Sequence, residues 1–193
     1  NQVGQYPYIN RHWGLGIEDN AAFYAEGTHA GLFDGTDDYI NVGDDASLDL
    51  GTGDFSFSGW IKLNNPSAGD FNMIYDKGAS TGQKRYGFLI YNNDTLALHL
   101  DSAFNSSLTI TDTDWHFVAV SCDRDGNAMF HLDGASDTVD ISSKSGDSLS
   151  STSDLRIGAK YDLSDHFFDG FVADLRIFSA AVSSGTVNTT LYG

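Results

Sequence analysis

The stretch LFDGTDDYINVGDDASLDLGTGDFSFSGWIKL, residues 32–63, decides the fold class. It begins with a turn at Asp34-Gly35, continues through a short strand around Ile40 and then crosses an acidic loop. From Phe55 to Leu63, every second position is a large apolar residue or, at position 59, glycine. Because side chains of a strand alternate between its two faces, this period predicts a strand with one face in a core.

The rest of the chain repeats this pattern of short strands and turns. Turn residues at 92–94 and 123–127 separate apolar runs and predict two hairpins. A short closing helix is expected over 183–192, with Val187 and Leu191 one turn apart. Many strands without helical crossovers predict an all-β fold, a two-sheet antiparallel jelly-roll sandwich with a short C-terminal helix.

The chain of 193 residues is long enough for one domain of this kind. Residues 1–29 carry scattered aromatic residues without a sustained period. We interpret them as an N-terminal arm that packs on the domain or on a neighbouring subunit, and residues 30–193 as the jelly-roll domain. Because residue 1 is Asn1 rather than Met, we expect that a leader or precursor was removed or that the chain begins within a longer protein.

The formal net charge of −17 comes from 27 acidic residues against 10 basic ones. All the acidic residues except Glu18 and Glu26 are Asp, a turn residue and a compact oxygen ligand for cations. Cation binding and simple solubility are two alternative explanations of this excess. The charge argues against nucleic acid and anionic membranes as partners, and no apolar run is long enough to span a bilayer.

Segments that recur in one known family occur here in that family's order. The chain resembles a laminin G-like domain of the concanavalin A-like lectin/glucanase superfamily over roughly residues 30–185. The matching segments are LFDGTDDYINVGD, DFSFSGWIKL, YDKG, RYGFLIYNND, DWHFVAVSCD, AMFHLDG, LRIGA and FDGFVADLRIFSAAVS. The resemblance implies a concave and a convex sheet with loops at the rim, and a module that binds carbohydrate or protein ligands.

The resemblance also implies a structural calcium ion, held between the start of the domain and its last strand. The corresponding carboxylates are Asp34 and Asp174, helped by a backbone carbonyl near Asn20 or Gly35. The alternative is that Asp34 only caps its turn and that Asp174 pairs with Arg176 or another nearby base.

Catalysis is not expected. Glycoside hydrolases with this fold place glutamates in an ExDxxE pattern on one strand, because hydrolysis needs two carboxyl groups facing the sugar. Both glutamates of this chain lie in the N-terminal arm, so the pattern is absent. A hydrolase that uses a pair such as Asp169 and Asp174 is the least favoured alternative.

Ligand-binding candidates are aromatic residues and planar or charged hydrogen-bonding groups near the predicted loops, since sugars are bound by such combinations. They are Asp76, Lys77, Arg85, Tyr86, Tyr91, Asn93, Arg156, Tyr161 and His166.

The sequence therefore predicts a non-catalytic recognition or adhesion module that binds carbohydrate at a cell or particle surface, extracellular or on a virion, with structural calcium. The alternative is an assembly or decoration protein of a virus particle or appendage, which forms a homo-oligomer or larger assembly through the N-terminal arm.

Overall fold

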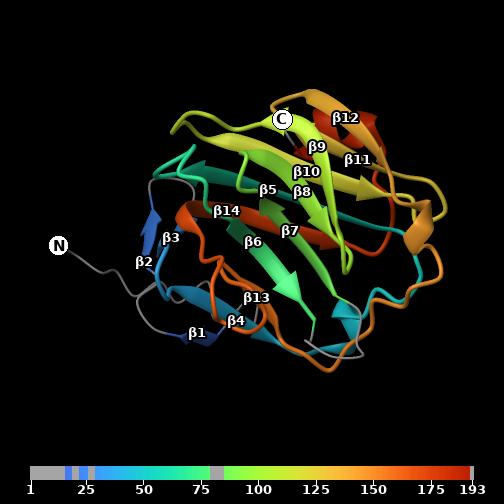
Figure 1. Ribbon diagram of the computed structural model, residues 1–193, viewed down its shortest axis with the longest axis horizontal. Coiled ribbons are helices and arrows are strands. Elements are labelled where there is room, and N and C mark those ends of the chain that lie inside the picture. The colour runs from blue at the N-terminus through green and yellow to red at the C-terminus, as the bar shows by residue number, and fades with distance from the viewer. Residues whose placement is uncertain (1–15, 19–21, 26–28, 79–84, 192–193) are drawn as a thin grey trace.

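The computed structural model describes residues 16–18, 22–25, 29–78 and 85–191. Within them, two seven-stranded antiparallel sheets pack face to face (Figure 1). The prediction of an all-β jelly-roll sandwich is confirmed. Asn20, one of the expected calcium ligands, and most of the predicted arm lie outside the described residues.

Sheet A faces the viewer in Figure 1 and has the strand order β1-β4-β13-β6-β7-β8-β9. Its strands are β1 (Gly16–Glu18), β4 (Tyr39–Gly43), β13 (Leu155–Ile157), β6 (Asn72–Lys77), β7 (Tyr86–Ile90), β8 (Thr95–His99) and β9 (Ala103–Thr109).

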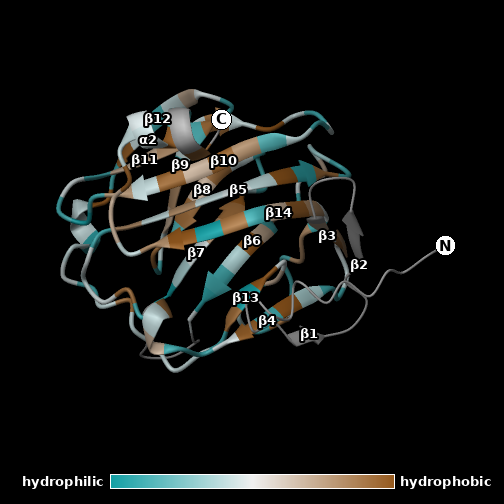
Figure 2. Cartoon of the chain, turned by 180° about the vertical axis from the view of Figure 1, so that it is seen from behind, coloured by the Kyte–Doolittle hydropathy of each residue, from teal (hydrophilic) through white to brown (hydrophobic). Residues whose placement is uncertain are grey.

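Sheet B faces the viewer in Figure 2 and has the order β12-β11-β10-β5-β14-β3-β2. Its strands are β12 (Ala135–Asp140), β11 (Asn127–Leu132), β10 (His116–Cys122), β5 (Phe55–Leu63), β14 (Asp169–Phe178), β3 (His29–Asp34) and β2 (Ala22–Ala25). The last strand of the chain, β14, therefore lies between two early strands, β3 and β5.

Aromatic rings dominate the core between the sheets. Phe57 of β5 has no exposed surface, and its ring centroid lies 4.5 Å from that of Tyr75 and 5.0 Å from that of Phe55. Tyr86 and Phe88 of sheet A complete its surroundings, at 5.7 and 6.5 Å. The alternation predicted for β5 is confirmed, because its large apolar residues at odd-numbered positions belong to this core.

Strand β14 contains a bulge that the sequence pattern did not predict. The pairing with β5 shifts between Ala173 and Arg176, and Asp174 adopts a positive φ of 49°. The extra residue turns Leu175 toward Gly59 of β5, where a Cβ atom would lie 2.3 Å from Leu175 Cδ2. Glycine is therefore required at position 59 to accommodate the bulge.

The C-terminal segment covers the outer face of sheet B. It forms α2 (Ser184–Thr186) and the π-type turn η3 (Val187–Leu191), and the Ser183 side chain accepts a hydrogen bond from the Thr186 amide. Val187 and Leu191 pack with Phe117 of β10, as the spacing predicted. No helix of the described residues is long and apolar enough to cross a membrane.

Three edge strands were not predicted as strands. β1 and β2 come from the segment interpreted as an arm, and they pair with β4 and β3 of the same chain. β9 pairs with β8, but its side chains are mostly exposed and polar. An edge strand with few buried residues lacks the apolar alternation by which strands are recognised. Two short 3-10 turns, η1 (Ala46–Leu48) and η2 (Ser142–Lys144), complete the described elements.

Candidate functional site

A row of polar residues crosses the outer face of sheet A. Arg156 of β13 pairs with Asp76 of β6, Asp76 with Gly87 of β7, and Gly87 with His99 of β8. Directly paired residues of neighbouring strands share a face. Tyr75, the neighbour of Asp76 in β6, belongs to the core. Because successive residues of a strand face opposite sides of the sheet, Asp76 and the rest of the row face away from the core.

Asp76 is a buried anchor in the middle of this row. Its side chain has no exposed surface, its Oδ1 accepts a hydrogen bond from Arg85 Nε at 2.7 Å, and its Oδ2 accepts one from the Tyr161 amide at 2.8 Å. Burial raises the pKa of Asp76, although Arg85 opposes this effect. A side chain at Gly87 would place its Cβ 2.9 Å from Asp76 Oδ1, so glycine leaves the space that the carboxylate needs.

The loop after β13 is held against this face by the same group. The Arg85 guanidinium lies 5.0 Å from the centre of the Tyr161 ring, and Lys160 Nζ lies 5.6 Å from it. Lys160 is itself paired with Asp165 at 3.0 Å and with Asp162 at 3.3 Å. Tyr161 is therefore fixed both through its backbone and through its ring.

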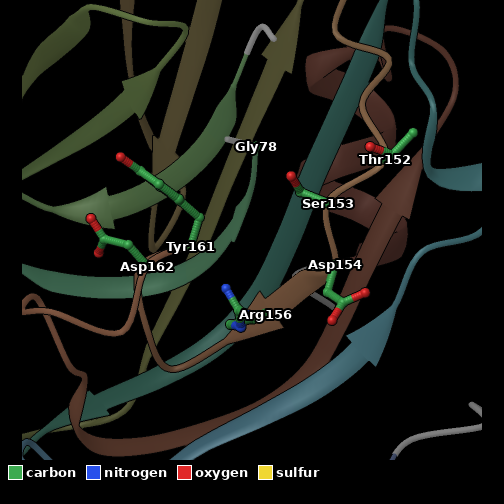
Figure 3. A pocket seen from close by; sticks show the side chains of 7 residues that line it. All are labelled: Gly78, Thr152, Ser153, Asp154, Arg156, Tyr161 and Asp162. Carbon is green, nitrogen blue, oxygen red and sulfur yellow. The ribbon is translucent and has the colours of Figure 1, made fainter. Parts of the chain in front are cut away.

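Beside Tyr161 there is an open pocket of about 420 Å³. Figure 3 shows Arg156 between Asp154 on one side and Tyr161 and Asp162 on the other. The described residues that line the pocket are Gly78, Thr152, Ser153, Asp154, Arg156, Tyr161 and Asp162. We refer to this set as the Arg156 pocket.

Arg156 is the basic group of this pocket, and part of its hydrogen-bonding capacity is unused. Its Nε is buried and has no hydrogen-bond partner among the described residues. The guanidinium lies 6.0 Å from the Tyr39 ring centre, which limits its motion. Because Nε is covered by protein atoms, a ligand would meet the guanidinium at its terminal nitrogens, which can donate several hydrogen bonds.

The two carboxylates of the pocket are held by neighbours. Asp154 Oδ2 accepts a hydrogen bond from Asn41 Nδ2 at 3.1 Å. Although partial burial raises the pKa of Asp162, hydrogen bonds from Ser164 and Lys160 more than offset it and leave the pKa below its ordinary value. Asp162 is therefore ionised at neutral pH and can accept hydrogen bonds from a ligand.

His99 adds a neutral polar group to the same face. Burial, with a smaller contribution from the charge of Arg85, lowers the pKa of His99 to about 4. Its Nδ1 is buried without a partner among the described residues.

The structure brings together four of the nine predicted ligand-binding residues. Arg156 and Tyr161 line the pocket, and Asp76 and Arg85 support Tyr161 from below. Tyr91 and His166 lie elsewhere and both pack on Phe71, at 4.7 and 4.4 Å between ring centroids. Asn93 is exposed in the β7–β8 turn and accepts a hydrogen bond from the Thr95 hydroxyl.

Lys77 and Tyr86 do not agree with their predicted role, because both point to the inner face of sheet A and are fully buried. Lys77 Nζ donates to the Ser151 carbonyl at 2.6 Å and to Asp44 at 2.8 Å. The Tyr86 hydroxyl donates to the Leu48 carbonyl at 2.9 Å. These two residues stabilise the fold and are not available to a ligand.

A second cluster lies in the β3–β4 turn and consists of Asp34, Asp37 and Asp38. One carboxylate oxygen from each lies within 4.8 Å of the others. Asp34 Oδ1 accepts hydrogen bonds from the amides of Thr36 and Asp37, so it does cap its turn. Asp38 is 3% exposed, and its Oδ1 is buried without a hydrogen-bond partner.

The environment of Asp38 in this cluster disfavours its charged form. Burial raises the pKa of Asp38, and the neighbouring charges of Asp34 and Asp37 raise it further. Three carboxylates around one point fit the hard oxygen ligands that calcium prefers. The orphaned Asp38 Oδ1 therefore fits a cation ligand.

The structure contradicts the predicted pairing of Asp34 with Asp174. The residue of β14 opposite Asp34 is Asp169, five positions before Asp174, which is about 17 Å along a strand. Asp174 sits in the β14 bulge and forms a bidentate ion pair with Arg176, at 2.6 and 3.0 Å. Of the predicted calcium ligands within the described residues, Asp34 lies in the cluster and Gly35 is next to it, whereas Asp174 does not belong to it.

Comparisons with known sequences and structures agree with this architecture. The sequence model of a family described as the concanavalin A-like lectin/glucanases superfamily, of the laminin G type, matches residues 34–188. No curated protein sequence matches the chain.

Several solved structures are similar in fold. The binding domain of botulinum neurotoxin DC in complex with SialylT has a TM-score of 0.68 at 17% identity, with 92% of this chain and 45% of that chain covered. The same binding domain in complex with rat synaptotagmin II has a TM-score of 0.67 at 17% identity, with 92% and 46% covered. The chain thus spans under half the length of these binding domains.

A third similar structure is domain 4 of AbnA, an extracellular GH43 arabinanase from Geobacillus stearothermophilus, in complex with arabinotriose. Its TM-score is 0.65 at 16% identity, with 88% of this chain and 80% of that chain covered. At these identities the likeness shows the fold alone.

Proposed function

The chain belongs to the concanavalin A-like lectin/glucanase superfamily, and from this we propose that it is a non-catalytic module that binds carbohydrate through the Arg156 pocket. The observation that carries the proposal is the pocket itself. It combines the Arg156 guanidinium with two carboxylates and a fixed aromatic residue. A few oriented polar groups beside an aromatic side chain are typical of small-ligand sites.

The charges of the pocket support binding rather than hydrolysis. A glycoside hydrolase needs one carboxyl group with a raised pKa to act as general acid. Asp162 has a lowered pKa, and Asp76, whose pKa is raised, is fully buried with both oxygens hydrogen-bonded. Neither of these two groups fits the role of an acid that reaches a ligand.

The similar structures support a ligand at a surface, because they are complexes with SialylT, rat synaptotagmin II and arabinotriose. We propose an extracellular or particle-surface setting on the same grounds. The alternative role in particle assembly depended on the N-terminal arm, most of which lies outside the described residues, and it stays a prediction.

Replacing Arg156 by alanine is expected to weaken glycan binding by about 10- to 100-fold, because a hydrogen bond to a charged group contributes about 1.5–3 kcal/mol. The wild-type protein is first screened on a glycan array in buffer with calcium, and the affinity for the best oligosaccharide is then measured by titration calorimetry. Arg176→Ala is the matched control, since Arg176 pairs with Asp174 on the other sheet.

Two results would contradict the proposal. A folded wild-type protein that binds no glycan on the array would exclude a lectin function. Full binding by the Arg156→Ala variant would exclude the Arg156 pocket as the site.

We also propose that the module binds a structural calcium ion at Asp34, Asp37 and Asp38, with the buried Asp38 Oδ1 as one ligand. At a calcium concentration a hundred times the dissociation constant, binding stabilises the fold by about 2.7 kcal/mol, or roughly 5–10 °C in melting temperature. Scanning calorimetry with calcium and with chelator measures this shift.

The pH dependence of the calcium effect follows from Asp38. Without calcium, its raised pKa means that the protonated form is favoured by folding, so this contribution to stability is lost as pH rises through the folded pKa. Calcium replaces the proton. The calcium-induced shift is therefore expected to be larger at neutral pH than at acidic pH.

The Asp38→Asn variant is expected to keep its stability without calcium and to lose the calcium response. Asp70→Asn serves as the control for charge, because Asp70 is exposed and distant in sequence from the cluster. An equal calcium response in the Asp38→Asn variant and the wild type would show that calcium, if bound, does not use Asp38.

A further inference from the structure

The charge of the Arg156 pocket limits the class of ligand that it can take. Among the described residues that line it, Arg156 is basic and both Asp154 and Asp162 are acidic. Of the nearby bases, Arg85 is paired with the buried Asp76 at 2.7 Å. Lys160 is shared between Asp162 at 3.3 Å and Asp165 at 3.0 Å, so Arg156 and Lys160 together face the three carboxylates of Asp154, Asp162 and Asp165. The pocket therefore has an excess of carboxylates within a chain of net charge −17.

This arrangement is unfavourable for a ligand of either charge. A sugar carboxylate or sulfate beside Arg156 would also lie near Asp154 and Asp162, and like charges at short range repel. A cationic amino sugar that approached the carboxylates would meet the guanidinium. An acidic sugar that pairs with Arg156 is repelled by the two aspartates, and a cationic sugar that pairs with the aspartates is repelled by Arg156.

A hydroxyl group can interact favourably with both the guanidinium and the carboxylates, because it can accept one hydrogen bond and donate another. The Arg156 guanidinium lines the pocket and can only donate hydrogen bonds. Asp162 is ionised and already interacts with Ser164 and Lys160. Any further hydrogen bond that it accepts in the pocket would come from the ligand. Hydroxyls on one sugar ring can accept from the arginine and donate to the aspartates at the same time.

We infer that the ligand of the Arg156 pocket is a neutral, hydroxyl-rich sugar, and that Asp154 and Asp162 select against acidic glycans. This inference rests on the proposed carbohydrate-binding function and adds the chemical class of the ligand. Arg156 supplies affinity, and the two aspartates supply selectivity.

The test uses the intact chain and pairs of probes that differ in charge on one backbone. The pairs are lactose and sialyllactose, oligogalacturonide in its methyl-ester and free-acid forms, and N-acetylglucosamine oligomers with and without their acetyl groups. If the protein binds either sugar of a pair, the neutral sugar is expected to bind at least about tenfold more tightly than the charged one. This factor corresponds to a difference of about 1.4 kcal/mol in binding free energy.

A double variant, Asp154→Asn with Asp162→Asn, separates selectivity from affinity. Asparagine keeps the shape and an acceptor oxygen for Asn41 while it removes the charge. The preference for the neutral form over the acidic form is expected to fall toward unity in this variant. Circular dichroism and thermal unfolding confirm that the variant is folded, and Asp70→Asn controls for the loss of charge elsewhere on the surface.

The possible results separate this inference from the proposed function. Equal or tighter binding of the acidic or cationic forms by the wild type would overturn the inference and leave the lectin function intact. An unchanged preference in the folded double variant would overturn the role of the two aspartates. Failure to bind any member of the pairs or any glycan on the array would overturn the proposed function itself.

Discussion

Replacing Phe57 by alanine is expected to lower the free energy of unfolding by about 4 kcal/mol, the largest effect of any substitution considered for this chain. The ring is fully buried between the sheets and contacts aromatic rings of both, Phe55 in sheet B and Tyr75, Tyr86 and Phe88 in sheet A. Its removal leaves a cavity that four rigid rings cannot fill without leaving their rotamers.

Equilibrium unfolding in urea, followed by tryptophan fluorescence, measures this loss. Phe57→Leu is the graded control and is expected to cost roughly half as much, because it keeps most of the apolar volume. A loss below about 1 kcal/mol for the alanine variant would mean that the two sheets close over the cavity, which the close packing of protein interiors argues against.

Replacing Lys77 by methionine is expected to cost about 3 kcal/mol of stability. The side chain has no exposed surface, and its ammonium group bonds Asp44 at 2.8 Å, Asp49 at 3.4 Å and the Ser151 carbonyl at 2.6 Å. Without the lysine these acceptors lose their partner in a confined space. The value is at the lower end for a buried ion pair because both carboxylates keep about a third of their surface exposed.

Lys62→Met is the matched control, since Lys62 is only half buried on the outer face of sheet B. Urea unfolding of both variants measures the difference. The remaining folded Lys77→Met protein should bind glycan as well as the wild type does, because Lys77 faces away from the Arg156 pocket. If the Lys77→Met variant lost glycan binding while its stability was unchanged, Lys77 would have to belong to the ligand site.

Much of the fold could be predicted from sequence because single strands carry their own signal. The alternation from Phe55 to Leu63 identified both the strand and its buried face. The turn residues at 92–94 marked the β7–β8 hairpin, in which Asp94 adopts a positive φ of 65°. These features depend on residues close in sequence, so a single sequence contains them.

Features that depend on contacts between distant residues could not be predicted. The β14 bulge at Asp174 exists because Leu175 packs over Gly59, and nothing near Asp174 in the sequence indicates it. The bulge reverses which residues of the last strand face the core. The expected cation pair of Asp34 and Asp174 was wrong because the pairing of β3 with β14 places Asp169 opposite Asp34.

The site was predicted in part for the same physical reason. Arg156 and Tyr161 were recognised as candidates by residue type. The face on which a side chain lies depends on the register of its strand, so Lys77 could not be distinguished from the adjacent Asp76. Asp154 and Asp162 were missed because aspartate is common throughout the chain and carries no distinguishing pattern.

The position of β14 between β3 and β5 constrains how the protein is made. During synthesis both flanking strands leave the ribosome long before Asp169–Phe178 does, and each waits with one edge unpaired. Such edges are templates for pairing with other chains. Sheet B therefore becomes continuous only after Phe178 has been synthesised, and a polypeptide that stops short of β14 is left with a split sheet rather than a smaller stable domain.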